Sequence, residues 1–212
     1  MRARRVLLTL LALGSLTVCF VPAWAGEPTE QLKGSVDKVL QILEDPKLKA
    51  EGLANERREA VRKVANTIFD FPETAKRALG RHWQSLSEKD REEFVTLFSD
   101  LLERSYIGKI EQYSGERIRY LGDSADGDTA VVRTRLIAKN GTEVPIDYRM
   151  LRSGDRWLVY DVSIEGVSLI ANYRTQFNKI IQTASYEELV KKMRAHDHGL
   201  GNTAPSGKPP RS

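Results

Sequence analysis

The sequence predicts an α+β fold in which helices cover one face of a curved antiparallel β-sheet. Three observations indicate this class. Apolar residues recur at helical spacing in the first half of the chain, alternating strands joined by glycine turns follow in the second half, and two further helical segments come after the last strand. The sequence has no internal repeat, and its length suits one domain with an ordinary hydrophobic core.

The first 25 residues have the pattern of a secretory signal peptide. Three arginines lie among the first five residues, an apolar run covers residues 6–21, and Ala23-Trp24-Ala25 matches the A-x-A pattern that precedes a signal peptidase site. We therefore expect a cleaved signal over residues 1–25 and a secreted domain over residues 26–195. The only cysteine, Cys19, lies in the signal, so no disulfide bond is expected in the mature domain.

The charge of the mature chain argues against nucleic acid as a partner. The whole sequence has 33 Lys and Arg against 29 Asp and Glu, a net charge of +4. Because the predicted signal holds three arginines and no acidic residue, the mature chain keeps 30 basic against 29 acidic residues, a net charge of +1. The remaining sequence contains no basic block and no zinc-ligand spacing. We therefore expect no nucleic-acid binding.

Four helical segments are expected before the sheet. Residues 29–43 carry apolar side chains on one helical face, and Asp45-Pro46 ends this segment. Asn55 is expected to cap the second helix, and Pro72 suits the first turn of a short third helix. The fourth helix begins at a capping box over residues 87–90. Its inward face is expected to consist of Phe94, Leu97, Phe98, Leu101, Leu102 and Tyr106.

The second half of the chain predicts a β-meander. The expected strands cover residues 117–121, 128–138, 144–150 and 157–164. Asn140-Gly141 predicts a two-residue hairpin of type I′, in which both residues have positive φ. Alternation places every second side chain on the face that meets the helices. On the last two strands this inward set is Val144, Ile146, Tyr148, Met150, Leu158, Tyr160, Val162 and Ile164.

The last strand is expected to turn into a helix at Gly166, because glycine accepts backbone dihedrals that other residues resist. Helices are expected over residues 167–183 and 186–195. The residues from 196 to 212 are rich in glycine, proline and polar side chains, and we expect them to form a disordered tail. A strand that turns directly onto a helix wraps the helix against its own sheet, so the space between them is either core or cavity.

The sequence contains no recognisable catalytic or metal-binding motif. Nucleophile elbow, phosphate-binding loop, dinucleotide-binding and zinc-protease patterns are all absent. His196-Asp197-His198 has no third ligand nearby, so we expect no metal site, and no cofactor is implied. Asp161 lies among apolar strand residues, where burial would raise its pKa, but a position on the solvent face or beside an arginine is favoured. No catalytic residue is predicted.

Three phrases occur together and give the chain a specific resemblance. V-Y-D-V-x-I-E-G-V-S-L begins at Val159, N-Y-R-x-Q-F at Asn172 and L-L-x-R-x-Y at Leu101. With their flanking residues they resemble the toluene-tolerance family, the MlaC-type periplasmic phospholipid-binding proteins of Gram-negative bacteria, over residues 30–193. The resemblance implies a sheet of nuclear-transport-factor (NTF2-like) character with helices packed over it, and a deep apolar cavity that takes acyl chains.

The resemblance also implies a function. The carrier would shuttle phospholipid between the outer membrane and an inner-membrane ABC transporter, and so maintain outer-membrane lipid asymmetry. Its implied partners are an outer-membrane lipoprotein–porin complex and an MCE-domain ABC transporter, and the carrier itself would be a monomer. The residues expected to line the cavity are Phe94, Phe98, Leu101, Tyr106, Val132, Leu136, Ile146, Tyr148, Met150, Val162, Ile164, Ile170 and Tyr173. Arg133, Arg135, Arg149 and Arg152 would meet the headgroup phosphate or a partner.

Two other functions stay open from the residues alone. An NTF2-like enzyme of the isomerase or hydratase type would need an ionisable side chain inside the cavity, and Asp161 or Asp147 would then have to point inward. A periplasmic interaction module or chaperone would instead have a completely filled interior. Periodicity shows which side chains point inward, but it does not separate a filled core from a lined cavity.

Overall fold

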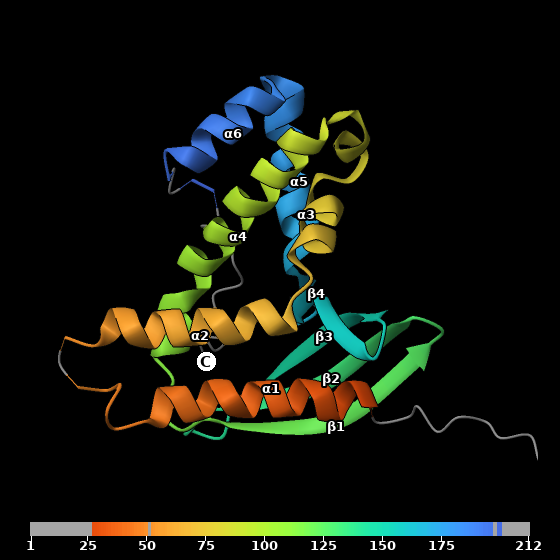
Figure 1. The fold of residues 1–212 in the computed structure, drawn as a ribbon. Helices are drawn as coiled ribbons and strands as arrows, with labels where there is room; N and C mark the ends of the chain where they lie inside the picture. Colours follow the sequence, from red (N-terminus) through yellow and green to blue (C-terminus); the bar gives the residue numbers. More distant parts are fainter. Residues whose placement is uncertain (1–26, 51, 197–198, 201–212) are drawn as a thin grey trace, which may run out of the picture.

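The structure is a computed structural model that describes residues 27–50, 52–196 and 199–200. The predicted signal peptide and most of the predicted tail lie outside these residues. The helices are α1 (Glu27–Glu44), α2 (Ala54–Ile68), α3 (Phe71–Leu79), the 3₁₀ helix η1 (Gly80–Ser85), α4 (Glu88–Glu111), α5 (Leu169–Thr183) and α6 (Tyr186–Arg194). The strands are β1 (Arg117–Asp126), β2 (Thr129–Ile137), β3 (Glu143–Ser153), β4 (Arg156–Ile164) and β5 (Val167–Ser168). The α+β class is confirmed (Figure 1).

The strands form one antiparallel sheet in the order β1-β2-β3-β4-β5, so each strand pairs with the next along the chain. This confirms the predicted meander. We call the face of the sheet that α1 and α2 cover the inner face, and the opposite one the outer face. From the register of paired residues, the inner face carries Ile118, Tyr120, Ala130, Val132, Thr134, Leu136, Val144, Ile146, Tyr148, Met150, Val159, Val162 and Ile164.

A β-bulge at Tyr160 changes which side chains of β4 face the helices. Met150 pairs with Val159, but the preceding residue of β3, Arg149, pairs with Asp161, so Tyr160 has no partner in β3. A bulge inserts one residue into one strand and shifts its alternation relative to the neighbouring strand. The inner face of β4 therefore passes from odd-numbered residues before Tyr160 to even-numbered residues after it.

This bulge makes the inward set predicted for β4 half wrong. Val162 and Ile164 lie on the inner face as predicted. Before the bulge, however, Trp157 and Val159 are the buried residues of the strand, in place of Leu158, and Tyr160 is the bulged residue itself. The prediction assumed one unbroken period of two along the strand, and a bulge breaks that period without a signal in the hydrophobic pattern.

The β2–β3 hairpin has a three-residue loop instead of the predicted two-residue type I′ turn. The N–H of Gly141 donates to the carbonyl of Ala138 at 2.9 Å, and the N–H of Ala138 donates to the carbonyl of Thr142 at 2.9 Å. Gly141 has φ 83°, whereas Asn140 is not among the residues with positive φ. This is a turn closed by a glycine bulge, in which only the glycine adopts the left-handed conformation.

Side chains cap most of the helix starts. The predicted cap at Ser87 is confirmed, because its hydroxyl oxygen accepts the N–H of Asp90 at 3.2 Å. Asp70, Ser168 and Ser185 cap α3, α5 and α6 in the same way. The predicted cap at Asn55 is wrong: α2 begins at Ala54, and the cap position belongs to Leu53, which makes no side-chain cap. Asn55 lies inside the first turn and is exposed.

The sheet lobe consists of the sheet and the two helices that run side by side over its inner face, α1 and α2 (Figure 1). Leu32 of α1 and Ile68 of α2 pack against Val132, Met150 and Val159 in one buried cluster. Each of these side chains is 8 % exposed or less. Burial of such side chains stabilises the fold by about 1.5–3 kcal/mol each.

Polar contacts hold α1 on the sheet. The hydroxyl of Thr29 donates to Asp123 of β1 at 2.5 Å. At the other edge, the backbone N–H of Trp157 in β4 donates to the side-chain carbonyl of Gln31 at 2.8 Å. The first turn of α1 is therefore bonded to two strands that lie far apart in the sheet.

A second core, formed by α3, α4, α5 and α6, makes the helical lobe (Figure 1). Phe94 and Phe98 of α4 meet Tyr173 and Phe177 of α5, with ring centroids 5.1–5.7 Å apart. All four rings are at most 1 % exposed. Leu200 falls within the predicted tail, and it is 7 % exposed and packs in this core.

Acidic side chains of α4 hold its second half against α2. The carboxylate of Glu111 accepts hydrogen bonds from Arg57 at 3.2 Å and from Arg58 at 3.0 Å. Glu103 pairs with Arg62 at 2.6 Å. These bonds lower the pKa of Glu111 from its ordinary value, with the bond from Arg58 as the largest cause.

Two buried polar atoms of the sheet lobe bond to no described residue: the hydroxyl of Tyr120 and the indole N–H of Trp157. The hydroxyl of Tyr148 is different, because it lies close enough to the Thr134 side chain to interact with it. Burial raises the pKa of Tyr148 to about 12, and the interaction with Thr134 acts in the opposite direction. A buried polar group without a partner typically costs about 1–3 kcal/mol.

The two tyrosines therefore predict opposite effects on stability. Tyr120→Phe should raise the free energy of unfolding by about 1 kcal/mol, because it removes a buried hydroxyl that bonds to no described residue. Tyr148→Phe should lower it by about 1 kcal/mol, because it removes the polar interaction with Thr134. Urea unfolding followed by circular dichroism measures both changes, and a shift in the same direction for both variants would contradict this reading of the core.

The ion pairs of Glu111 predict a pH dependence. Because its pKa is lower in the folded than in the unfolded state, its contribution to stability is complete above the unfolded carboxyl pKa and is lost as the pH falls through the folded pKa. The difference in unfolding free energy between the wild type and Glu111→Gln should thus shrink from neutral to acid pH. Glu92→Gln, an exposed carboxylate on the same helix without an ion pair among the described residues, should show no such trend.

Candidate functional site

One end of the inner face is sealed. This end lies beside the β1–β2 and β3–β4 turns, where Ala130, Met150 and Val159 sit side by side on three strands. Their side chains are 2 %, 1 % and 0 % exposed. Leu32 and Ile68 close over them from α1 and α2. This end of the inner face is core in the ordinary sense.

The other end of the inner face is less well covered. Leu136 pairs with Val144, and Ile146 lies between Thr134 and Ile164 in the register. The four aliphatic side chains of this end, Leu136, Val144, Ile146 and Ile164, are all half-buried. We call them the half-buried end. Burial thus decreases along the strands toward the β2–β3 hairpin, although the side chains remain apolar.

Tyr106 of α4 is half-buried as well, and it lies past the last fully buried residue of that helix, Leu101. Burial raises the pKa of Tyr106, and the nearby Tyr173 of the helical lobe acts in the same direction. On the next turn Ile110 is 37 % exposed. The second half of α4 therefore carries apolar side chains that are incompletely covered, close to the helix α2 that covers the inner face.

The structure divides the predicted cavity lining between two cores. Val132, Leu136, Ile146, Tyr148, Met150, Val162 and Ile164 lie together on the inner face. Phe94, Phe98, Leu101, Ile170 and Tyr173 lie in the helical core, where each is 4 % exposed or less and the aromatic rings pack against one another. The sequence does not separate the two groups, because both show the same inward periodicity.

The predicted arginines lie apart from the inner-face cluster. Arg133 is exposed and donates to Ser124 at 3.3 Å. Arg135 is half-buried and donates to the carbonyl of Thr134, and Arg152 bonds the carbonyl of Gly154 in the β3–β4 turn. Arg149 lies on the outer face opposite Asp161, with its Nε 3.8 Å from the carboxylate.

Both carboxylates that an enzyme would need in the cavity lie on the outer face. Asp147 pairs with Arg133 across the strands, in alternation with Ile146 and Tyr148 of the inner face. Asp161 is 7 % exposed and accepts hydrogen bonds from the hydroxyl of Ser168 at 2.6 Å and from the N–H of Ile170 at 3.2 Å. Asp161 thus caps the start of α5, as a carboxylate at a helix N-terminus does favourably.

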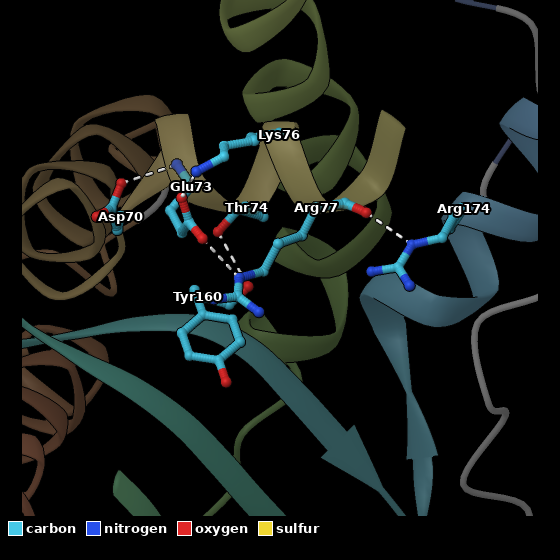
Figure 2. A network of polar contacts seen from close by, with 7 residues as sticks. All are labelled: Asp70, Glu73, Thr74, Lys76, Arg77, Tyr160 and Arg174. Carbon is cyan, nitrogen blue, oxygen red and sulfur yellow. Dashed lines mark hydrogen bonds and ion pairs between the residues drawn. The ribbon is translucent and has the colours of Figure 1, made fainter. Parts of the chain in front are cut away.

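A close network on α3 was not singled out by the sequence reasoning. Arg77 stacks over the ring of Tyr160 at 4.0 Å, and its Nε donates to Glu73 at 2.7 Å (Figure 2). Arg174 of α5 reaches across to donate from its Nε to the backbone carbonyl of Arg77 at 2.7 Å. Arg174 belongs to the N-Y-R-x-Q-F phrase, so the motif contained the residue but gave no indication of its partner.

Two further features bear on the function classes. Within the described ranges, no three His, Cys, Asp or Glu side chains gather in a group that could hold a metal ion. None of the helices described here combines the length and the apolar character that a membrane span requires.

Comparison with known proteins gives consistent relatives. The sequence matches the MlaC protein family over residues 33–195. It is 24 % identical over 172 residues to the intermembrane phospholipid transport system binding protein MlaC of Haemophilus influenzae, covering 79 % of this chain and 80 % of that protein. It is also 24 % identical over 182 residues to the toluene tolerance protein ttg2D of Pseudomonas putida, covering 84 % of this chain and 82 % of that protein.

A solved structure extends the likeness to three dimensions. The fold matches a phospholipid-binding protein from Ralstonia solanacearum, solved in complex with a phospholipid, with a TM-score of 0.71 and 29 % sequence identity. The match covers 82 % of this chain and 98 % of that one. The resemblance expected from the three sequence phrases is therefore confirmed. This chain belongs to the MlaC protein family.

Proposed function

We propose that this protein is a periplasmic carrier that binds phospholipid by its acyl chains and shuttles it between the outer membrane and an inner-membrane ABC transporter. The family membership supports this, as do a relative named as a phospholipid transport binding protein and a structural relative solved with a bound phospholipid. The predicted signal peptide over residues 1–25 supports a periplasmic location.

The observation that carries the proposal is the decrease of burial along the inner face. Ala130, Met150 and Val159 are sealed at one end, whereas the half-buried end keeps apolar side chains incompletely covered. A fold that only needed stability would gain from covering those side chains, since each buried methylene contributes about 0.8 kcal/mol. We infer that Leu136, Ile146, Ile164 and Tyr106 meet acyl chains.

The physical task explains why a carrier is needed. Each methylene of an acyl chain that moves from a bilayer into water costs about 0.8 kcal/mol, so a two-chain lipid cannot cross an aqueous compartment at a useful rate. An apolar wall inside a protein removes most of that cost. The same wall must release the lipid at its destination, which a partly open site permits more readily than a closed core.

The proposed partners follow from the same family relation. A lipoprotein–porin complex would exchange lipid with the carrier at the outer membrane, and an MCE-domain ABC transporter would do so at the inner membrane. The sequence has no phosphate-binding loop for nucleotide, so the direction of transport would come from these partners. Arg133 and Arg135 on the outer face, and Arg152 at the β3–β4 turn, are proposed as contacts for them.

The direct test is lipid analysis of the native protein. Protein purified from a Gram-negative periplasm should release phospholipid on organic extraction, detected by mass spectrometry. Delipidated protein should regain lipid from vesicles. Protein that carries no phospholipid after purification and takes none from vesicles would overturn the proposal.

A large side chain in the half-buried end should block binding. We expect Ile146→Trp to lower the amount of bound phospholipid roughly tenfold, because displacing two methylenes from the site costs about 1.6 kcal/mol. Val95→Trp is the matched control: Val95 is also half-buried and apolar, but it packs against the helical core. This control should lose stability, by about 1–3 kcal/mol, and keep its lipid. Equal lipid loss in both variants would argue against the inner face as the site.

A further inference from the structure

Two adjoining surface pockets lie against α5, the smaller beside α3 and the sheet, and the larger beside the end of α3 and η1. The first has a volume of about 260 Å³ and is lined by Arg77, Arg149, Tyr160, Asp161, Ser168, Ile170, Ala171 and Arg174. The second, of about 460 Å³, is lined by Leu79, Gly80, Arg81, Arg174, Thr175 and Asn178. Arg174 belongs to both. The lining of the smaller pocket thus contains three arginines and a single carboxylate.

Two of these arginines are held in place through the inner nitrogen of the guanidinium group. The Nε of Arg77 donates to Glu73 at 2.7 Å, while its guanidinium stacks over the Tyr160 ring (Figure 2). The Nε of Arg174 donates to the carbonyl of Arg77 at 2.7 Å. The terminal nitrogens of both groups bond to no other residue of the described chain. The side chains are therefore pre-oriented, and the donors that usually bind an anion remain available.

The carboxylate in the pocket does not neutralise the arginines. One oxygen of Asp161 accepts the Ser168 hydroxyl at 2.6 Å, and the other accepts the N–H of Ile170 at 3.2 Å. The Nε of Arg149 lies 3.8 Å from this carboxylate, beyond hydrogen-bond distance, and the arginine side chain is 51 % exposed. At this distance and with an exposed arginine the ion pair is weak, so Arg149 remains able to bind another anion.

We propose that the pocket formed by Arg77, Arg149 and Arg174 binds a phosphate group, either free phosphate or the phosphate of an anionic phospholipid headgroup. A carboxylate offers two oxygens and is satisfied by one guanidinium fork. A phosphate offers more oxygens in a tetrahedral arrangement, which suits guanidinium groups that converge from three elements, α3, β3 and α5. The neighbouring pocket, with Arg81 and Asn178, leaves room for the rest of a headgroup.

This site is separate from the proposed acyl-chain site. Arg149 lies between Tyr148 and Met150 in β3, so its side chain projects from the outer face while theirs project from the inner face. A lipid whose chains occupy the inner face would not have to place its own phosphate here. The inference therefore goes beyond the proposed function and gives the outer face a binding role of its own.

The test uses the guanidinium groups themselves as reporters. The Nε–H resonances of Arg77 and Arg174, assigned by substitution, are followed by NMR in the purified protein during titration with inorganic phosphate. In parallel, sedimentation measures binding to phosphatidylcholine vesicles with and without phosphatidylglycerol. Binding to both probes, or to either one, supports the site and identifies the source of the phosphate. Perturbation of neither resonance by phosphate, together with equal binding to the two kinds of vesicle, would overturn it.

Substitutions of the arginines test whether the phosphate probe binds in this pocket. Arg149→Gln and Arg174→Gln should each weaken binding of the effective probe about tenfold, as expected for the loss of a charge-assisted bond. Arg104→Gln removes the same charge from an exposed position on α4 and should leave the binding unchanged. The Arg149 side chain is exposed, so its variant keeps the test valid if Arg174→Gln unfolds. If Arg149→Gln and Arg174→Gln bound the probe as tightly as Arg104→Gln does, the result would contradict the proposal. Co-purifying phospholipid should persist in Arg149→Gln, which separates this test from that of the proposed function.

Discussion

Strand β4 holds the two lobes together, and the bulge at Tyr160 is the feature that allows it to do so. Before the bulge the strand contributes Trp157 and Val159 to the core under α1 and α2. After the bulge the alternation is shifted, so Asp161 faces outward and binds the first turn of α5 through Ser168 and a backbone N–H. Without the extra residue, that carboxylate would point into the apolar interior, where an unpaired charge is very unfavourable.

Helix α3 also contributes to this connection between the lobes, through hydrogen bonds to β4. The N–H of Asp70 donates to the carbonyl of Val159 at 2.9 Å. The hydroxyl of Thr74 donates to the carbonyl of Tyr160 at 3.1 Å, and Figure 2 shows both of these residues. Backbone carbonyls beside the bulge are thus bonded from the start of α3. The helical lobe keeps a closely packed core, while the sheet lobe keeps an inner face that is only partly covered.

The division between the lobes gives the proposed function a physical basis. The four central rings of the helical lobe, Phe94, Phe98, Tyr173 and Phe177, pack edge to face and are at most 1 % exposed, so this core supplies stability. The half-buried end of the inner face forgoes part of the stability that full burial would give. An acyl chain in contact with Ile146 and Ile164 would supply the missing apolar contacts, which is the thermodynamic linkage of ligand binding to folding.

Much of the fold could be predicted from local sequence. The features that could not be predicted depend on contacts between distant parts of the chain. Ser87 and Pro72 identified helix starts because capping and proline geometry depend on a few neighbouring residues. The bulge at Tyr160 and the loop around Gly141 depend on pairing with another strand, which no local pattern contains.

The candidate site was only partly predictable for the same reason. Periodicity placed Phe98 and Ile146 on inward faces, but it could not show that they face different cores. The arginine pocket combines residues from three separate elements, and only Arg149 among its three arginines was selected from the sequence.

The most direct measurement is site-specific photo-crosslinking to lipid in the periplasm of a Gram-negative cell. A diazirine amino acid with an aliphatic side chain close to isoleucine in size, which should not fill the site as tryptophan would, is placed at Ile146 on the inner face or at Val95 on the helical lobe, both half-buried positions. After irradiation, intact-protein mass spectrometry detects covalent lipid. The account predicts a phospholipid adduct at position 146 and none at position 95. Adducts at position 95 alone, or equal labelling of both positions, would contradict it.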